Sequence, residues 1–177
     1  MIVDGRVIAE GVYARLPKKA LKLGIIIGEA SPVIDSFVKI KQKAAERLGV
    51  ELVREELPEG AATADAVAAV IALAAKTDGI IVQLPLPKQI DVEEVLAAIP
   101  PEKDVDGISA APMVRPPVAE AIREILEFAH IDAKGKKTVV VGSGRLVGKP
   151  SASLLKELGA SVRVLTHGDS LDALKDA

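Results

Sequence analysis

Short runs of β-branched apolar residues alternate with helical stretches along the first hundred residues of this chain. Buried strands are predicted over residues 21–28, 50–57 and 79–84, and helices over residues 32–48, 62–76 and 92–99. Strands separated by helices pair in parallel through right-handed crossovers. The alternation therefore predicts an α/β fold with ligand sites at the carboxyl ends of the strands. A short helix over residues 7–16 precedes this pattern.

A second α/β pattern follows a small, proline-rich segment that has neither helical nor strand period, residues 108–117. The elements predicted beyond it are a helix over 118–129, a strand over 138–141, a glycine-rich turn over 142–148, a helix over 149–158 and a strand over 161–165. We expect two domains, an N-terminal three-layer α/β domain over 1–114 and a C-terminal Rossmann-type dinucleotide-binding domain over 115–177. The second domain has fewer predicted strands than a complete one.

Composition excludes several classes of function. A net charge of -2 argues against a nucleic-acid-binding or anionic-membrane surface. The chain has no cysteine and two histidines, His130 and His167, so we expect no disulfide, thiolate chemistry or metal site. The first residues lack the pattern of a secretory signal, and no apolar run reaches the length of a membrane span. We therefore expect a cytoplasmic protein.

The glycine-rich turn is a candidate cofactor site. It follows a branched-apolar strand and leads into a helix, with the spacing G-x-G-x-x-x-G in place of the commoner G-x-G-x-x-G. Glycines let the backbone approach a pyrophosphate, and free N–H groups at the helix start favour its negative charge. The predicted cofactor-binding residues of this turn are Gly142, Ser143, Gly144, Arg145, Val147 and Gly148.

Two further segments resemble the walls of an active site. The third strand ends in the amide of Gln83, and Pro85 and Pro87 give it a rigid exit. Some twenty residues later, Asp104 and Asp106 stand in a tight turn, so that one carboxylate can face a ligand while the other supports the turn. Prolines at strand exits and Asp-x-Asp-Gly turns are also common in α/β proteins without any such role.

The first long helix places an aromatic ring and an ammonium one turn apart, at Phe37 and Lys41. Spacing alone favours a solvated lysine-rich face here. The order of all these segments, however, resembles the methylenetetrahydrofolate dehydrogenase/cyclohydrolase family. The segments that carry the resemblance are Asp4-Gly5, the Phe37–Lys41 helix, Gln83-Leu84-Pro85-Leu86-Pro87, Lys103-Asp104-Val105-Asp106-Gly107 and Gly142 to Pro150.

The resemblance implies a folate site beside a nicotinamide site, and two reactions of one-carbon metabolism and purine biosynthesis. 5,10-Methylenetetrahydrofolate is oxidised with NADP or NAD, and the methenyl product is hydrolysed to 10-formyltetrahydrofolate. Lys41 matches the catalytic lysine that carries protons during hydrolysis, Gln83 the amide that orients it, and Asp106 the carboxylate that binds the pterin. Phe37, Pro85 and Asp104 are the further substrate-binding candidates. Family members also suggest a homodimer.

Departures from the family pattern refine these expectations. Phe37 replaces a tyrosine, so the ring is kept and a hydroxyl is lost, which is expected to weaken hydrolysis. Ser143 replaces an arginine, and Asp169 follows the second strand of the cofactor domain, so NAD is mildly favoured over NADP unless Asp169 caps a helix. The end of the family pattern is missing, as in a fragment or a reduced homologue. An inactive folate- or nucleotide-binding remnant and a shikimate-dehydrogenase-like oxidoreductase are the alternatives.

Overall fold

The structure of the chain, a computed structural model, describes residues 2–29 and 31–176. It divides into two compact units: Arg15–Val114 forms one, and the residues up to Ala14 join those from Arg115 onward in the other. The N-terminal helix thus groups with the C-terminal part of the chain. The division into domains after residue 114 remains a prediction.

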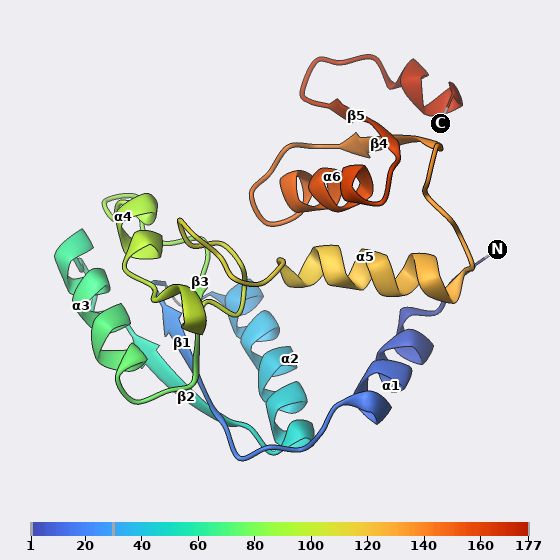
Figure 1. Cartoon of the computed structure of the whole chain (residues 1–177). Coiled ribbons are helices and arrows are strands. Elements are labelled where there is room, and N and C mark those ends of the chain that lie inside the picture. Colours follow the sequence, from blue (N-terminus) through green and yellow to red (C-terminus); the bar gives the residue numbers. More distant parts are fainter. Residues whose placement is uncertain (1, 30, 177) are drawn as a thin grey trace. The chain divides into compact units, whose positions relative to one another are not determined.

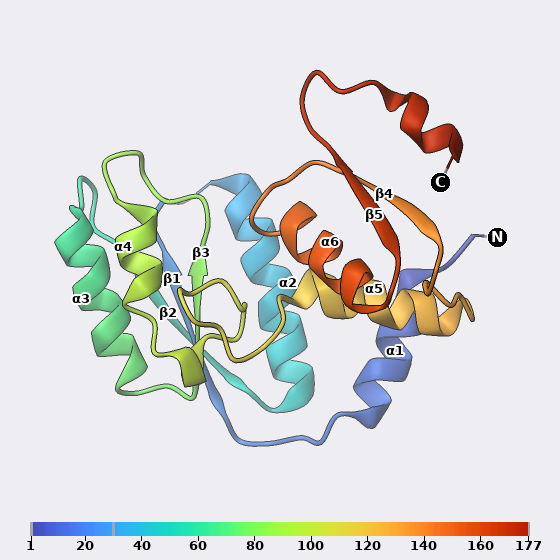
Figure 2. The ribbon, with the colours of Figure 1, turned by 45° about the horizontal axis from the view of Figure 1, so that its top comes forward.

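The unit Arg15–Val114 is a parallel sheet between helices (Figure 1). The strand order is β2-β1-β3, and both pairings are parallel, as the alternation of elements predicts. Figures 1 and 2 show α2 on one face of the sheet and α3 and α4 on the other. The three-layer α/β arrangement is confirmed. The elements are β1 (Lys22–Ile27), α2 (Pro32–Leu48), β2 (Glu51–Glu56), α3 (Thr63–Ala74), β3 (Gly79–Gln83), α4 (Val92–Ala97) and the 3₁₀ segment η1 (Pro101–Lys103).

Successive residues of β1 supply the two cores of this unit. Ile25 and Ile27 pack with Ile34 and Val38 of α2, whereas Ile26 belongs to the larger core formed with α3 and α4. All five side chains are buried. Side chains alternate between the faces of a strand, so a continuous apolar run is what a strand covered on both faces requires.

The ends of α2 follow from its sequence. Ser31 precedes the helix and accepts a hydrogen bond of 3.2 Å from the Ile34 N–H, and Pro32 occupies the first helical position. Gly49 ends the helix in the left-handed region, with φ of 74°. These signals fix where the helix starts, and hence which of its side chains face the end of the sheet.

The other unit contains a two-stranded parallel sheet and its helices. Leu154 of α6 and Leu165 of β5 are buried, so α6 covers one face of this small sheet. The elements are α1 (Gly5–Arg15), α5 (Pro117–Phe128), β4 (Lys137–Val141), α6 (Gly148–Glu157), β5 (Ser161–Leu165) and the 3₁₀ segment η2 (Leu171–Asp176). Among the described residues, no helix has the length and apolar character needed to cross a membrane.

Candidate active site

The exit of β3 is held against the end of β1. A Cβ added at Gly28 would lie 2.7 Å from both Leu86 Cδ2 and Pro87 Cδ, so the chain after β3 occupies the space that a side chain would need. The Leu84–Pro85 peptide bond is cis, Pro85 is exposed and Leu86 is buried. Gln83, the last residue of β3, leads into a segment that packs against Gly28 at the end of β1.

The amide of Gln83 is engaged at both ends. Its Oε1 accepts a hydrogen bond of 3.0 Å from Lys41 Nζ, and its Nε2 donates one of 3.0 Å to the Leu84 carbonyl. Because donor and acceptor are both occupied, the amide has one preferred orientation. The structure thus brings together two of the predicted catalytic residues, one from α2 and one from β3.

The two aspartates of the 104–107 turn differ in their surroundings. Asp104 is 2% exposed, its Oδ2 accepts a hydrogen bond of 2.7 Å from the Ser109 N–H, and its backbone forms a bridge with Ile80. Asp104 therefore supports the turn, which Gly107 completes with φ of 62°. Its assignment as a substrate-binding residue stays a prediction.

Asp106 is the aspartate that interacts electrostatically with Lys41. Burial raises the pKa of Asp106, the charge of Lys41 opposes that shift, and the charge of Asp104 adds to it. The half-buried carboxyl thus lies within electrostatic reach of Lys41. The three predicted catalytic residues, Lys41, Gln83 and Asp106, gather in one unit of the chain.

An apolar stripe runs along α2 beside the lysine. Val33, Phe37 and Ile40 are 65%, 52% and 63% exposed, and their spacing puts them on one helical face. Phe37 lies one turn before Lys41. An exposed aromatic and aliphatic surface next to hydrogen-bonding groups suits a flat ligand with a polar edge.

The glycine-rich turn in the other unit meets the steric needs of a close backbone approach. A Cβ at Gly148 would lie 2.1 Å from the Gly142 carbonyl oxygen, so α6 starts directly against the end of β4. Gly142 has φ of 98°, and no atom lies within 4 Å of a Cβ built at Gly142 or Gly144. The turn surface is therefore open to a ligand at these two glycines, as a pyrophosphate requires.

The first turn of α6 differs from the expectation of free N–H groups. The N–H groups of Lys149 and Ser151 donate to the carbonyls of Gly144 and Val147, each at 3.0 Å, and Pro150 has no N–H. Anion binding here would depend on the loop before the helix. From the sequence, only the missing N–H of Pro150 could be predicted. The hydrogen bonds of the Lys149 and Ser151 N–H groups could not, because their acceptors are backbone carbonyls.

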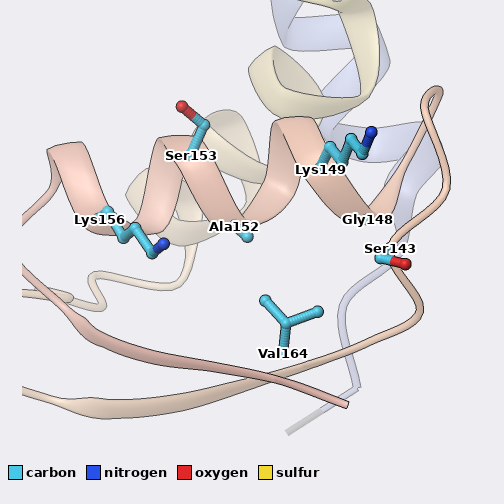
Figure 3. Close-up of a pocket in the computed structure, with 7 residues that line it drawn as sticks. All are labelled: Ser143, Gly148, Lys149, Ala152, Ser153, Lys156 and Val164. Atoms are coloured by element: carbon cyan, nitrogen blue, oxygen red, sulfur yellow. The ribbon is translucent and has the colours of Figure 1, made fainter. Parts of the chain in front are cut away.

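A pocket of about 290 Å³ lies between α6 and β5 (Figure 3). Figure 3 shows Lys156 and Ala152 pointing toward Val164, and Ser153 and Lys149 pointing away from it. Two predicted cofactor-binding residues line the pocket, and Lys156 is a cation that the motif did not indicate. The lining residues are Ser143, Gly148, Lys149, Ala152, Ser153, Lys156 and Val164.

The side chain of Asp169 accepts hydrogen bonds from Thr166, three residues earlier. Its Oδ2 accepts hydrogen bonds from the N–H and the hydroxyl of Thr166, at 2.5 and 2.9 Å, and these bonds lower the pKa of Asp169. The carboxylate therefore closes the turn after β5 and does not cap η2, which starts at Leu171. An exposed negative charge stands just beyond the end of β5.

Two sequence models cover most of the chain. The catalytic domain of tetrahydrofolate dehydrogenase/cyclohydrolase matches residues 3–106, and the NAD(P)-binding domain of the same enzymes matches residues 116–175. The chain belongs to the tetrahydrofolate dehydrogenase/cyclohydrolase family. This confirms the resemblance inferred from the motifs, and family membership replaces the shikimate-dehydrogenase-like alternative.

Individual members of the family are similar to this chain in sequence and in structure. The bifunctional protein FolD of Methanoculleus marisnigri is 36% identical over 93% of this chain and 64% of its own length. That of Geotalea uraniireducens is 33% identical over 97% of this chain and 68% of its own length. The solved dehydrogenase-cyclohydrolase of Trypanosoma brucei, in complex with NADP and an inhibitor, has a TM-score of 0.92 and 28% identity, over 100% of this chain and 69% of that one. The chain thus spans between 64% and 69% of the length of these relatives.

Proposed function

We propose that this chain carries out the two reactions of its family. In the first, 5,10-methylenetetrahydrofolate gives up a hydride to NAD or NADP and becomes the methenyl cation. In the second, water adds to the methenyl carbon, a proton is released and 10-formyltetrahydrofolate forms. The observation that carries the proposal is the hydrogen bond from Lys41 to Gln83, with Asp106 in electrostatic reach of the same lysine.

The residues around Lys41 bind different parts of the folate. The Asp106 carboxyl accepts hydrogen bonds from the pyrimidine edge of the pterin, and Phe37 offers its exposed ring to the flat faces of the substrate. Pro85 and Asp104 complete the folate side, the first as exposed surface and the second by holding the turn of Asp106.

Lys41 acts in the hydrolytic step. In its neutral form, the amino group, held by Gln83, would take up the proton of the attacking water, which general acid–base catalysis requires to be within hydrogen-bond reach. Phe37 has no hydroxyl to join this relay. We therefore expect hydrolysis to be slower in this chain than in family members that have a tyrosine at this position, whereas oxidation is less affected.

The cofactor side is the turn from Gly142 to Gly148, with Asp169 beside it. When bound, the nicotinamide ring accepts the hydride. The residues fit such a group, because the backbone is open at Gly142 and Gly144. The negative charge of Asp169 suits ribose hydroxyls and repels a 2′-phosphate, so we propose a preference for NAD.

The setting proposed for this activity is a cytoplasmic homodimer that serves one-carbon metabolism and purine biosynthesis, with no nucleic-acid or membrane partner. The supporting observations are the net charge of -2 and the family membership. The pocket of about 290 Å³ beside α6 is small for a ligand pocket and would hold only part of a dinucleotide.

An absorbance assay of the purified chain tests the proposal. The chain is mixed with 5,10-methylenetetrahydrofolate and either NAD or NADP, and reduced cofactor and methenylfolate are followed separately. Reduced cofactor with accumulating methenylfolate supports oxidation with slow hydrolysis. Folate binding without any reduction would contradict the oxidoreductase proposal and favour the binding remnant, for which the loss of a hydroxyl at Phe37 is the observation in favour.

A further inference from the structure

Lys103 reaches the carboxyl-terminal end of α3. Its ammonium donates hydrogen bonds to the carbonyls of Ala74, at 2.5 Å, and Thr77, at 2.8 Å. The last carbonyls of a helix lack intrahelical partners and carry the negative end of its dipole. The side chain immediately before Asp104 is thus fastened to an element that ends 29 residues earlier.

The turn that follows Lys103 is fixed on two more sides. A Cβ at Gly79 would lie 2.6 Å from Val105 Cγ1, so the turn packs directly on the start of β3. The backbone of Asp104 bridges Ile80, and its carboxylate closes the loop through Ser109. With these attachments in place, Asp106 has little freedom to move relative to β3.

We propose that Lys103 is a positioning residue for Asp106. By clamping the turn to α3, it holds the Asp106 carboxyl half buried and within reach of Lys41. Neither the motif matches nor the family comparison gives Lys103 this role. The part of the inference that concerns folate rests on the proposed function, whereas the placement of Asp106 does not.

A merely structural cap on α3 and a positioning residue make different predictions for Asp106. If Lys103 only capped α3, its loss would leave the pKa of the Asp106 carboxyl unchanged or, through the loss of a positive charge, raise it. Loosening of the turn would expose that carboxyl to water and lower its pKa toward the ordinary value for aspartate, because burial is the main cause of the raised pKa. The direction of the change therefore separates the two roles.

The experiment compares Lys103→Met, which keeps the aliphatic stem, with Lys103→Arg, which keeps the charge and the donors. Lys76→Met is the matched control, because Lys76 lies at the same end of α3 and its ammonium pairs with Glu55, at 3.8 Å. The Asp106 carboxyl is titrated by ¹³C NMR, and kcat and KM for methylenetetrahydrofolate are measured.

We expect Lys103→Met to lower the pKa of Asp106 and to raise KM by roughly tenfold or more, with kcat less affected. Lys103→Arg should restore both, and Lys76→Met should change neither.

An unchanged or raised pKa of Asp106 in Lys103→Met, with wild-type KM and only a lower melting temperature, would overturn the proposal. Lys103→Gln, one bond shorter and still a donor, replaces the methionine variant if that variant does not fold. Failure of the wild-type chain to bind or oxidise the folate would count against the proposed function alone. The titration of Asp106 would then still decide whether Lys103 positions it.

Discussion

Lys41 Nζ donates a hydrogen bond of 3.0 Å to Gln83 Oε1, across 42 residues of sequence. The contact joins the middle of α2 to the last residue of β3, and the second donor–acceptor pair of the amide, with the Leu84 carbonyl, prevents the amide from turning away. A lysine on a helix face is mobile by itself. Here its amino group has a defined place, which a proton-transferring group needs before substrate arrives.

Replacing Gln83 by leucine tests this relationship. Gln83→Leu keeps the side-chain size but removes the acceptor for Lys41, so the rate of methenylfolate hydrolysis should fall roughly 100-fold. Hydride transfer should be affected less, because it needs no proton relay. Hydrolysis is measured as the decay of methenylfolate absorbance. Gln42→Leu is the control, because Gln42 is half-buried on α2 and donates to the exposed Glu46. Equal losses in hydrolysis from both variants would contradict the role of Gln83.

Phe37→Tyr restores the hydroxyl that the family pattern contains. Phe37 is 52% exposed and one turn from Lys41, so a phenol there can join the hydrogen bonds around the lysine without entering the core. A single hydrogen bond contributes about 1 kcal/mol, so hydrolysis should become about five- to tenfold faster in the variant. The ratio of 10-formyl to methenyl product in a coupled assay measures this. Phe128→Tyr, also exposed and on α5, serves as the control and should leave that ratio unchanged.

The helices and strands that could be predicted from the sequence are those with clear end signals or a clear apolar pattern. Pro32 and Gly49 fix the ends of α2, and the unbroken apolar run of β1 predicts a strand covered on both faces. The order of α/β elements follows from such signals. The 3₁₀ form of η2 does not, because six residues are too few for an apolar pattern to distinguish a 3₁₀ helix from an α-helix.

The candidate site is predictable only where its contacts are between side chains of recognisable type. The association of Lys41 with Gln83 and Asp106 could be expected from the family resemblance, whereas spacing alone favoured a solvated lysine face. The contacts of Lys103 could not be predicted, because its partners are backbone carbonyls, which every residue type has. For the same reason the attachment of Asp169 to Thr166 could not be distinguished in advance from a helix cap or a ribose contact.

The raised pKa of Asp106 has a consequence for stability. Because the folded chain holds this proton more tightly than the unfolded chain, the free energy of unfolding falls as pH rises from the ordinary value of 3.8 through the raised pKa. Asp106→Asn cannot ionise. Its stability relative to the wild type should therefore increase across that window and level off above it, while folate affinity is lost. Urea unfolding of both proteins between about pH 3 and about pH 7 measures the difference. A constant difference across this range would contradict burial as the cause.

Asp169→Asn tests the preference for NAD. An asparagine oxygen can still accept the hydrogen bonds from Thr166, so the turn is kept while the negative charge is removed. The KM for NADP should fall by roughly tenfold, because the 2′-phosphate is no longer repelled, whereas the KM for NAD should not fall. Added salt should reduce the difference between wild type and variant, since the carboxylate is exposed. Asp172→Asn, another exposed carboxylate nearby in the chain, should leave both KM values unchanged. An equal change in KM for both cofactors in Asp169→Asn would contradict this electrostatic account.

Gly148→Ala tests whether the cofactor turn depends on the close approach of α6 to β4. A methyl group there would lie 2.1 Å from the Gly142 carbonyl oxygen, and the obstacle is backbone that cannot rotate away. Relief requires the turn to open, which should cost about 1–3 kcal/mol of stability and weaken binding of NAD, measured by fluorescence of the reduced cofactor. Gly11→Ala is the control, because a Cβ at Gly11 in α1 meets no atom within 4 Å. Alanine in a helix interior should raise the melting temperature slightly in that variant. A Gly148→Ala variant with wild-type stability and cofactor affinity would show that the turn tolerates separation of α6 from β4.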